Sequence, residues 1–575
     1  MKTKAKKNQG GIGLDLNLVI AGEAGQGLQT LEQIIGKALY RQGYNVFSHK
    51  DYMSRVRGGH NFMQIRFGNE EFHSPREEID ILIALNQDGV ENHQQRVQPE
   101  GYILFDGEAE NDRIISVPAK ELAKQVNPKA ANTVYLGVLW QLLGFNLEKL
   151  KKVIKEKFPK EEVQQDNLEL LQAGYDSVEA GIEVEEPARS GGEGYLFLEG
   201  NQAIGLGAAL AGVQFYSAYP MTPSTGILNY LAYRQDKLGI AVEQAEDEIA
   251  AINMALGASF AGARAMTGTS GGGFSLMTEA FGLAGLMEAP LVIAEVMRPG
   301  PATGMPTRTA QGDLNFVINA SQDEFPLKVI APRDQEDAFY QAFRAFNLAE
   351  KYQMPVVILS DQFLSDSAST VPEFKLDELE IARYLIDEDN WPEGKEYQRY
   401  EFTDDGISPR AYPGQLSDEV VLLDSHEHFQ TGRISEDIDI RNAMVDKRSR
   451  KFEKQRREDT LEPFYSGPEK PEVLMVGFGS TYGPMLEVQQ RLVEEGENVG
   501  MLSFNDVWPL PTAELEKRNA YNTHLVVVEN NSTGQFSRLI TAYTEMGADY
   551  RMLQYDGRPF TTDELYNRMK DEVKY

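Results

Sequence analysis

Short apolar runs alternate with segments of helical apolar spacing in three stretches of the chain. The first stretch opens with the apolar run 16–21, continues through the glycine-rich segment 22–27 and then shows helical spacing over 28–42. An apolar run of strand length, a glycine-rich turn and a helix form the repeating unit of a parallel α/β fold. The pattern predicts a sheet with helices on both faces and ligands at the carboxyl ends of its strands.

The same alternation returns twice further along the chain, so the sequence indicates an α/β protein with three α/β units. The elements predicted after residue 200 are a helix over 245–262 and strands at 264–267, 291–296 and 355–359; those predicted after residue 470 are strands at 473–476 and 525–528 and a helix over 486–495.

Segments without this periodicity suggest the domain boundaries. We expect a first domain over 1–185, a second over 195–370, a polar connecting segment over 371–468 and a third domain over 469–575. The stretch 185–194 is rich in glycine and charged residues, which is typical of an exposed linker. A connection as long as the third segment is usually functional or faces a partner.

Charge and cysteine content exclude several classes of function. The 575 residues carry a net charge of -32 and include no cysteine. Nucleic acid is not expected as a partner, because its binding requires Lys and Arg to neutralise phosphates. Without cysteine the chain holds no disulfide and no cysteine-ligated iron–sulfur cluster.

The absence of long apolar runs and of suitably spaced metal ligands leads to predictions about cellular location and metal binding. No apolar run reaches the length of a membrane span or a signal core, so we expect a cytoplasmic protein without membrane contact. Only His426 and His428 cluster among the histidines, and no third ligand is suitably spaced, so no metal site is expected.

The segment 219–225 is a candidate ligand-binding loop. Pro220 and Pro223 fix the backbone, and Tyr219 and Thr222 are among the hydroxyl groups that they hold in place. An ordinary stiff connection between a strand and a helix would have the same composition.

Two charged residues are candidates for chemistry. Glu248 opens the predicted helix at 245–262, where it either complements the helix dipole or points into a site as a carboxyl acting on a cofactor. Arg298 follows the strand at 291–296 and precedes a loop rich in proline and glycine. It is either a carboxylate clamp or a surface arginine.

Two glycine-rich segments are candidates for close approach of a ligand. The segment 267–273 lacks the lysine of a Walker loop, so close backbone packing against a ligand or subunit is favoured over phosphate binding. The turn at 22–27 is a weak dinucleotide fingerprint because its glycines are misordered. With residues 54–61 it offers N–H groups and arginines to phosphates, although a tight turn with a solvated loop fits equally well.

Together these motifs resemble the alpha subunit of 2-oxoacid:ferredoxin (acceptor) oxidoreductases, with a gamma domain fused in front of alpha. The gamma domain resembles the family at 22–27 and in Ser54-x-x-Arg57-Gly58-Gly59, and the alpha domain carries the Tyr-Pro-Ile-Thr-Pro-Ser loop with Met221 in place of isoleucine. The resemblance covers nearly the whole chain, because further matching segments follow in order at 248–257, 267–273, 298–309, 405–410, 529–531 and 555–560.

The resemblance implies a gamma domain, a pyrimidine-binding-type domain of thiamine enzymes and a transketolase C-terminal-like domain. It also implies roles for individual residues: Glu248 bonds N1′ of the cofactor aminopyrimidine, Thr222 and Tyr219 lie at the substrate, and Arg298 pairs with the C1 carboxylate. Thr307 is implied to tune side-chain preference. The coenzyme A residues implied are Gly25, Gly27, Arg57, Gly58 and Gly59.

The implied activity is the thiamine diphosphate-dependent oxidative decarboxylation of a 2-oxoacid, with coenzyme A and ferredoxin as co-substrates. The chain has no Gly-Asp-Gly diphosphate motif and no cysteine. The resemblance therefore implies a beta subunit that holds Mg²⁺, the diphosphate and a [4Fe-4S] cluster, in an (alpha-beta)₂ heterotetramer.

The sequence is compatible with three alternatives. We expect 2-oxoglutarate as substrate, but pyruvate or branched-chain 2-oxoacids fit the same motifs. A non-catalytic coenzyme A-binding scaffold is compatible with the missing diphosphate motif, and a nicotinamide-dependent dehydrogenase is a weaker alternative.

Overall fold

The structure is a computed structural model in which the chain forms two compact units. The first unit comprises Met1–Leu198, Asp366–Glu373 and Phe560–Asp571, and the second comprises Glu199–Ser365, Phe374–Pro559 and Glu572–Tyr575. Strands and helices alternate in both, which confirms the predicted α/β class. The residues described are 14–55, 58–108, 113–179, 181–387, 389, 391–392, 395–417, 419–519 and 523–574, with the backbone of 3–4.

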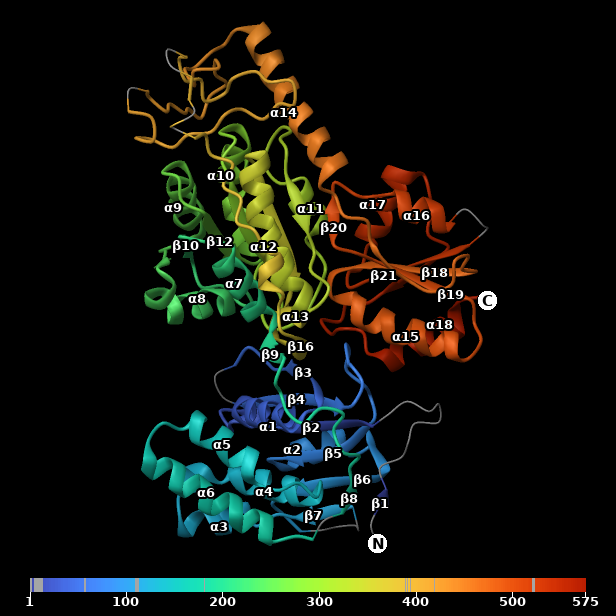
Figure 1. The fold of residues 1–575 in the computed structure, drawn as a ribbon. Helices are drawn as coiled ribbons and strands as arrows, with labels where there is room; N and C mark the ends of the chain where they lie inside the picture. The colour runs from blue at the N-terminus through green and yellow to red at the C-terminus, as the bar shows by residue number, and fades with distance from the viewer. Residues whose placement is uncertain are drawn as a thin grey trace. The chain divides into compact units, whose positions relative to one another are not determined.

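An eight-stranded mixed sheet of order β7-β6-β5-β2-β4-β3-β16-β9 forms the first unit (Figure 1). β2, β5, β6 and β7 pair in parallel, whereas β4 is antiparallel to both β2 and β3. Residues of β2 alternate between two apolar cores, since Leu18 and Ile20 pack with helices α1, α4, α5 and α6 and Val19 and Ala21 pack with α2.

The strands of the first unit are β2 (Asp15–Ala24), β3 (Asn45–Asp51), β4 (Gly58–Gly68), β5 (Ile79–Ala84), β6 (Val97–Phe105), β7 (Ile114–Ser116), β9 (Tyr195–Glu199) and β16 (Ala368–Pro372), and a separate parallel pair is β1 (Thr3–Lys4) with β8 (Ile182–Glu183). Its helices are α1 (Leu28–Gln42), α2 (Gln87–His93), α3 (Ala119–Gln125), α4 (Asn132–Leu142), α5 (Glu148–Lys157), α6 (Glu161–Asp176) and α18 (Thr562–Glu572).

Two details of this unit differ from the sequence-based expectation. Residues 54–61 were considered as a basic loop, but β4 begins at Gly58. The stretch 185–194 has no buried residue, as expected of an exposed linker, but it is tied to the unit by hydrogen bonds: Tyr44 Oη donates to Glu185 O over 2.7 Å, and Arg189 Nε donates to Gly43 O over 3.1 Å. The domain boundaries themselves stay predictions.

Two sheets make up the second unit. The seven-stranded sheet has the order β11-β10-β12-β13-β15-β14-β20, and all its neighbours are parallel except β20. The five-stranded sheet has the order β17-β19-β18-β21-β22. One apolar core includes Ile293 and Val357 of the first sheet and Val476 and Val527 of the second. The C-terminal portion therefore packs on the central portion, and its β20 also extends the first sheet.

The strands of the second unit are β10 (Phe215–Ala218), β11 (Ala241–Gln244), β12 (Ala265–Thr269), β13 (Leu291–Met297), β14 (Lys328–Ile330), β15 (Pro355–Asp361), β17 (Phe464–Ser466), β18 (Val473–Phe478), β19 (Val499–Phe504), β20 (Asp506–Trp508), β21 (His524–Glu529) and β22 (Tyr550–Leu553). Its helices are α7 (Gly200–Leu210), α8 (Thr225–Leu238), α9 (Glu248–Phe260), α10 (Gly271–Leu286), α11 (Leu314–Ile318), α12 (Gln335–Tyr352), α13 (Gln362–Asp366), α14 (Ile438–Glu458), α15 (Tyr482–Glu494), α16 (Ala513–Arg518) and α17 (Gln535–Thr544).

The polar segment after residue 371 contains a long helix, α14, that periodicity did not predict. Its buried stripe includes Lys447 and Lys451, whose ammonium groups both contact the buried carboxylate of Glu288, with Lys451 at 2.6 Å. The motif at 405–410 has a structural task here, because Arg410 pairs with buried Glu350. Buried ion pairs therefore help to dock this segment, together with buried apolar side chains such as Met444.

Within the described residues, no helix combines the length and apolar character needed to cross a membrane.

Candidate active site

Five strands of the second unit carry the candidate residues at their carboxyl ends. The strands β11, β10, β12, β13 and β15 are successive neighbours in the seven-stranded sheet, and all five run parallel. Loops beyond the carboxyl ends of such strands meet at one edge of the sheet. The residues brought to this edge are Thr222 after β10, Glu248 after β11, Ser270 after β12, Arg298 after β13 and Asp361 at the end of β15.

The loop after β10 is held at several points. Asn201 Nδ2 donates to Pro223 O over 2.9 Å, and Ser224 Oγ donates to Met221 O over 2.8 Å. The Thr222–Pro223 peptide is cis. Thr222 is half-buried, whereas Tyr219 is 42% exposed. The loop has the fixed backbone that its prolines predicted.

Arg298 joins this loop from the next-but-one strand. Its side chain is buried, and Nη1 donates a hydrogen bond of 2.7 Å to the carbonyl oxygen of Thr222. Burial lowers the pKa of Arg298, and the nearby carboxylate of Asp313 opposes that shift. The arginine is therefore part of the sheet edge rather than a surface residue.

Glu248 is the first residue of α9 and is buried, although residues at a helix start are often exposed. Asp247 caps the helix instead, since its Oδ1 accepts from Ala250 N over 2.7 Å. No hydrogen bond reaches the Glu248 carboxylate from the described part of the chain. Capping does not account for Glu248, which leaves its carboxyl available to a ligand.

Two of the glycines at 267–273, Gly271 and Gly273, make room for acidic side chains. A Cβ placed on Gly273 would lie 2.5 Å from Glu248 Oε1 and 2.1 Å from Thr269 Oγ1. A Cβ on Gly271 would lie 2.4 Å from Asp313 Oδ2. The close backbone packing that the sequence favoured is present, but it is packing against the chain's own carboxyl groups.

Thr307 is buried in the loop that follows Arg298, and the C-terminal portion holds this loop. All four polar groups of Gln311 form hydrogen bonds. Its backbone N donates to Asn530 O at 2.7 Å, and its backbone O accepts from Asn531 Nδ2 at 3.1 Å. Its side chain donates from Nε2 to Phe478 O at 2.7 Å and accepts at Oε1 from Asn530 N at 3.0 Å. Thr309 N also donates to Gly557 O over 3.1 Å. The motifs at 529–531 and 555–560 thus anchor the loop.

Three carboxyl groups were missed by the sequence analysis: Glu295 and Asp361, which are buried, and Asp313, which is half-buried. Burial is the main cause that raises the pKa of each, to about 6 for Asp313. Glu295 had a visible signal, because it interrupts the apolar strand 291–297.

In the first unit, the fold brings the two glycine motifs together. β2 and β4 pair so that Ala24 lies opposite Gly58, and Gly25, Gly27, Gly58 and Gly59 all have positive φ. Gly27 precedes α1 without a side-chain cap, so N–H groups of its first turn remain available to a ligand. Arg57 lies outside the described residues.

Metal ligands are not grouped in the part of the chain that the structure describes: no cluster of three or more His, Cys, Asp or Glu is placed to hold an ion.

Three family models match successive parts of the sequence. These are pyruvate ferredoxin/flavodoxin oxidoreductase over 17–177, the thiamine diphosphate-binding part of pyruvate flavodoxin/ferredoxin oxidoreductase over 206–432, and pyruvate:ferredoxin oxidoreductase core domain II over 471–565.

Among curated relatives, the 2-oxoacid:ferredoxin oxidoreductase subunit alpha of a Sulfolobus species is 33% identical over 97% of each chain. The 2-oxoglutarate synthase subunit KorA of Archaeoglobus fulgidus is 33% identical over 59% of this chain and 88% of its own. A solved structure is also similar: 2-oxoglutarate:ferredoxin oxidoreductase from Magnetococcus marinus with 2-oxoglutarate, coenzyme A and succinyl-CoA bound. It is 32% identical, has a TM-score of 0.90 and covers 97% of this chain and 100% of that one.

Proposed function

The chain belongs to the alpha subunits of the 2-oxoacid:ferredoxin oxidoreductases, and we propose that it acts on 2-oxoglutarate, with coenzyme A as acyl acceptor. The family models and full-length relatives place it in this class of oxidoreductase and give it a thiamine diphosphate-binding domain. Relatives and a solved structure named for 2-oxoglutarate support that substrate. The observation that carries the proposed site is the Arg298–Thr222 hydrogen bond, which unites two loops at the sheet edge beside Glu248.

The surroundings of Glu248 fit an aminopyrimidine. Its carboxyl is buried, has no donor within the described residues and lies against the backbone of Gly273. When bound, thiamine diphosphate supplies a nucleophilic carbon and an electron sink for decarboxylation. Glu248 would hold a proton between its carboxyl and N1′ of the ring, and burial of this contact away from water would strengthen the hydrogen bond.

Arg298 is the proposed partner of the C1 carboxylate of the substrate. Its guanidinium is fixed at one end by Thr222 O, which reduces the rotational freedom that substrate binding must remove. Thr222 and Tyr219 lie on the same loop and are proposed substrate contacts. Thr307, anchored through Gln311, is the proposed determinant of side-chain preference.

Coenzyme A is proposed to bind the first unit. Gly25, Gly27, Gly58 and Gly59 bring backbone N–H groups together through the β2–β4 pairing. A Cβ placed on Gly25 or on Gly58 would meet no atom within 4 Å, so the space beside both is open. Arg57, which adjoins Gly58 in the sequence, would add a cation for phosphate.

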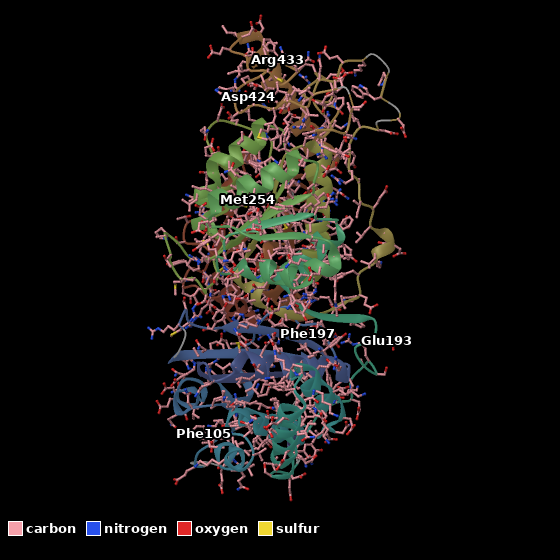
Figure 2. All side chains as sticks on the ribbon, turned by 90° about the vertical axis from the view of Figure 1, so that its left-hand side faces the viewer. Phe105, Glu193, Phe197, Met254, Asp424 and Arg433 are labelled. Atoms are coloured by element: carbon pink, nitrogen blue, oxygen red, sulfur yellow. The ribbon has the colours of Figure 1, made fainter. Side chains whose placement is uncertain are left out.

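A beta subunit is proposed to cover the exposed helices α9 and α10. Ile249 and Met254 on α9 are 51% and 42% exposed, and Leu276 on α10 is 52% exposed. This side of the unit faces the viewer in Figure 2, where Met254 is labelled. We propose that the partner supplies Mg²⁺, the diphosphate site and the [4Fe-4S] cluster in an (alpha-beta)₂ assembly that reduces ferredoxin. The cytoplasmic location stays a prediction.

Turnover by the complex of this chain with its beta partner tests the proposal. We expect preferential oxidation of 2-oxoglutarate over pyruvate and branched-chain 2-oxoacids, dependent on coenzyme A, with ferredoxin reduced. Preference for pyruvate would overturn the substrate assignment. Undiminished turnover in Glu248→Gln and Arg298→Lys together would favour a non-catalytic scaffold.

A further inference from the structure

Glu295 is a fully buried acid that receives no hydrogen bond from a donor among the described residues. It lies in the middle of β13, paired in register with Thr269 of β12 and Leu359 of β15, and its side chain is 0% exposed. Neither carboxylate oxygen has a hydrogen-bond partner in the described part of the chain. An ionised carboxylate in such a place is strongly disfavoured, so Glu295 needs either a proton or a donor.

The group that can share a proton with Glu295 is another carboxyl, that of Asp313. Asp313 lies at the start of α11, with its oxygens against Gly271, and its charge raises the pKa of Glu295 further after burial has done so. Two carboxyl groups in contact form a hydrogen bond only when one of them carries a proton. One proton between Glu295 and Asp313 satisfies both groups.

Two other charged groups of the described chain act on this pair, Asp361 on Glu295 and Arg298 on Asp313. Arg298, three positions after Glu295 on the same chain segment, is the cation that lowers the pKa of Asp313. Asp361 comes from β15 and has its own donors, Ser480 Oγ and Leu364 N at 3.0 Å. With one shared proton, the single negative charge of the pair balances the positive charge of Arg298.

We infer that Asp313, sharing a proton with Glu295, is an internal counter-ion of Arg298, and that binding of a 2-oxoacid at Arg298 is coupled to proton uptake by this carboxyl pair. The inference rests on the proposed function, in which Arg298 receives the C1 carboxylate. An arriving carboxylate adds a second negative charge beside the pair, and like charge favours protonation. The carboxyl pair takes up one proton from solvent, and this proton neutralises the added negative charge.

The coupling between proton binding and substrate binding determines how substrate affinity changes with pH. The free complex titrates at the pair near pH 6, because burial raises the pKa of Asp313 to about 6, and the liganded complex titrates higher. Substrate affinity is therefore highest below pH about 6 and falls above it, by up to about tenfold per pH unit, until the second titration is passed. A 2-oxoacid remains anionic throughout this range, so the substrate does not produce the slope.

Calorimetric titration of the thiamine-loaded complex with N-oxalylglycine tests the inference. This dicarboxylate keeps the C1 carboxylate but has an unreactive amide carbonyl. Titrations at pH 7 in two buffers of different ionisation enthalpy measure proton uptake, which we expect to be about half to one proton in the wild type. In Asp313→Asn we expect no uptake and a Kd independent of pH from about 6 to 8.

Controls separate this inference from the proposed function. Glu295→Gln mimics the protonated acid and should retain uptake, because its amide still donates to Asp313. Unchanged uptake in Asp313→Asn overturns the coupling, whereas unchanged N-oxalylglycine affinity in Arg298→Ala overturns the substrate site itself. If the Asp313→Asn variant does not assemble with the beta partner, infrared spectra test whether the carboxyl pair carries a proton. The wild type must then show a protonated carboxylic acid band at pH 7 that Glu295→Gln lacks.

Discussion

Arg298 donates a hydrogen bond of 2.7 Å to the carbonyl oxygen of Thr222, which lies 76 positions earlier in the sequence. Neither residue could be assigned to the other from local pattern, because they follow different strands. The bond exists because β10 and β13 flank β12 in one parallel sheet. It joins two separate loops at one edge of the sheet.

Replacing Glu248 with Gln should lower turnover of 2-oxoacid by at least about 100-fold, the range typical of a lost proton-transfer group. The change conserves volume, so assembly with the beta partner should be retained. The matched control is Glu246→Gln, an exposed acid one residue before the helix cap. Turnover and co-purification are measured in parallel, and equal loss in both variants would refute the role of Glu248.

Gly273→Ala should displace the Glu248 carboxylate, since the new Cβ would stand 2.5 Å from Glu248 Oε1. We expect turnover to fall by at least about tenfold, by analogy with other small displacements of catalytic groups. Gly272→Ala is the control in the same helix, because its nearest neighbour would be Met221 Cε at 3.4 Å. Similar kinetics of the two variants would contradict the packing argument.

Gln311→Ala should raise the KM for 2-oxoacid while kcat changes less. The substitution leaves Phe478 O and Asn530 N without their partner, at about 1–3 kcal/mol for each buried group, and loosens the loop that carries Thr307. Gln322→Ala, at an exposed position nearby, is the control. A pure loss of stability without a change in KM would show that the anchor does not position the loop.

Gly58→Ala should raise the KM for coenzyme A and leave the KM for 2-oxoacid unchanged. Gly58 has φ 74, a conformation that costs a residue with a Cβ about 1–2 kcal/mol, so the backbone N–H groups beside Gly25 should shift. The control is Gly194→Ala, which has φ 77 and equal open space but lies outside the glycine motifs. Equal coenzyme A kinetics in both variants would argue against a site at Gly58.

Glu288→Gln should lower the free energy of unfolding by about 3–5 kcal/mol, because it removes the buried charge that Lys447 and Lys451 share. Urea unfolding at pH 7 measures this loss, with Glu279→Gln on the exposed face of α10 as control. A loss no larger than that of the control would mean that the ion pairs do not dock α14.

The same carboxylate predicts a pH dependence. Burial alone would raise the pKa of Glu288, but the charges of Lys447, Lys451 and Arg399 together hold it below the ordinary value. A lowered folded-state pKa contributes stability that is present in full above the unfolded-state pKa of about 4.3 and is lost progressively as pH falls from there through the folded-state pKa. The difference in unfolding free energy between wild type and Glu288→Gln should therefore be the same at pH 7 and pH 5 and should begin to shrink at pH 4.

Much of the fold was set by local pattern. The helix α1 begins and ends at the residues that apolar spacing predicted, and strands such as β13 and β15 were recognisable as apolar runs. The helix α14 was missed because its buried stripe, apart from Met444, consists of polar and charged residues, including Lys447 and Lys451. Their burial becomes favourable only when Glu288 is brought opposite them.

The sequence by itself determined the α/β class, the family and the identity of its motif residues, because these depend on spacing along the chain. Only the tertiary structure decided which residues meet: Thr222 with Arg298, Glu248 with Gly273, Gln311 with Asn530 and the carboxyl of Glu295 beside that of Asp313. The reason is physical. A strand's apolar pattern fixes its face and length, whereas strand order in the sheet, which no local pattern encodes, fixes its neighbours.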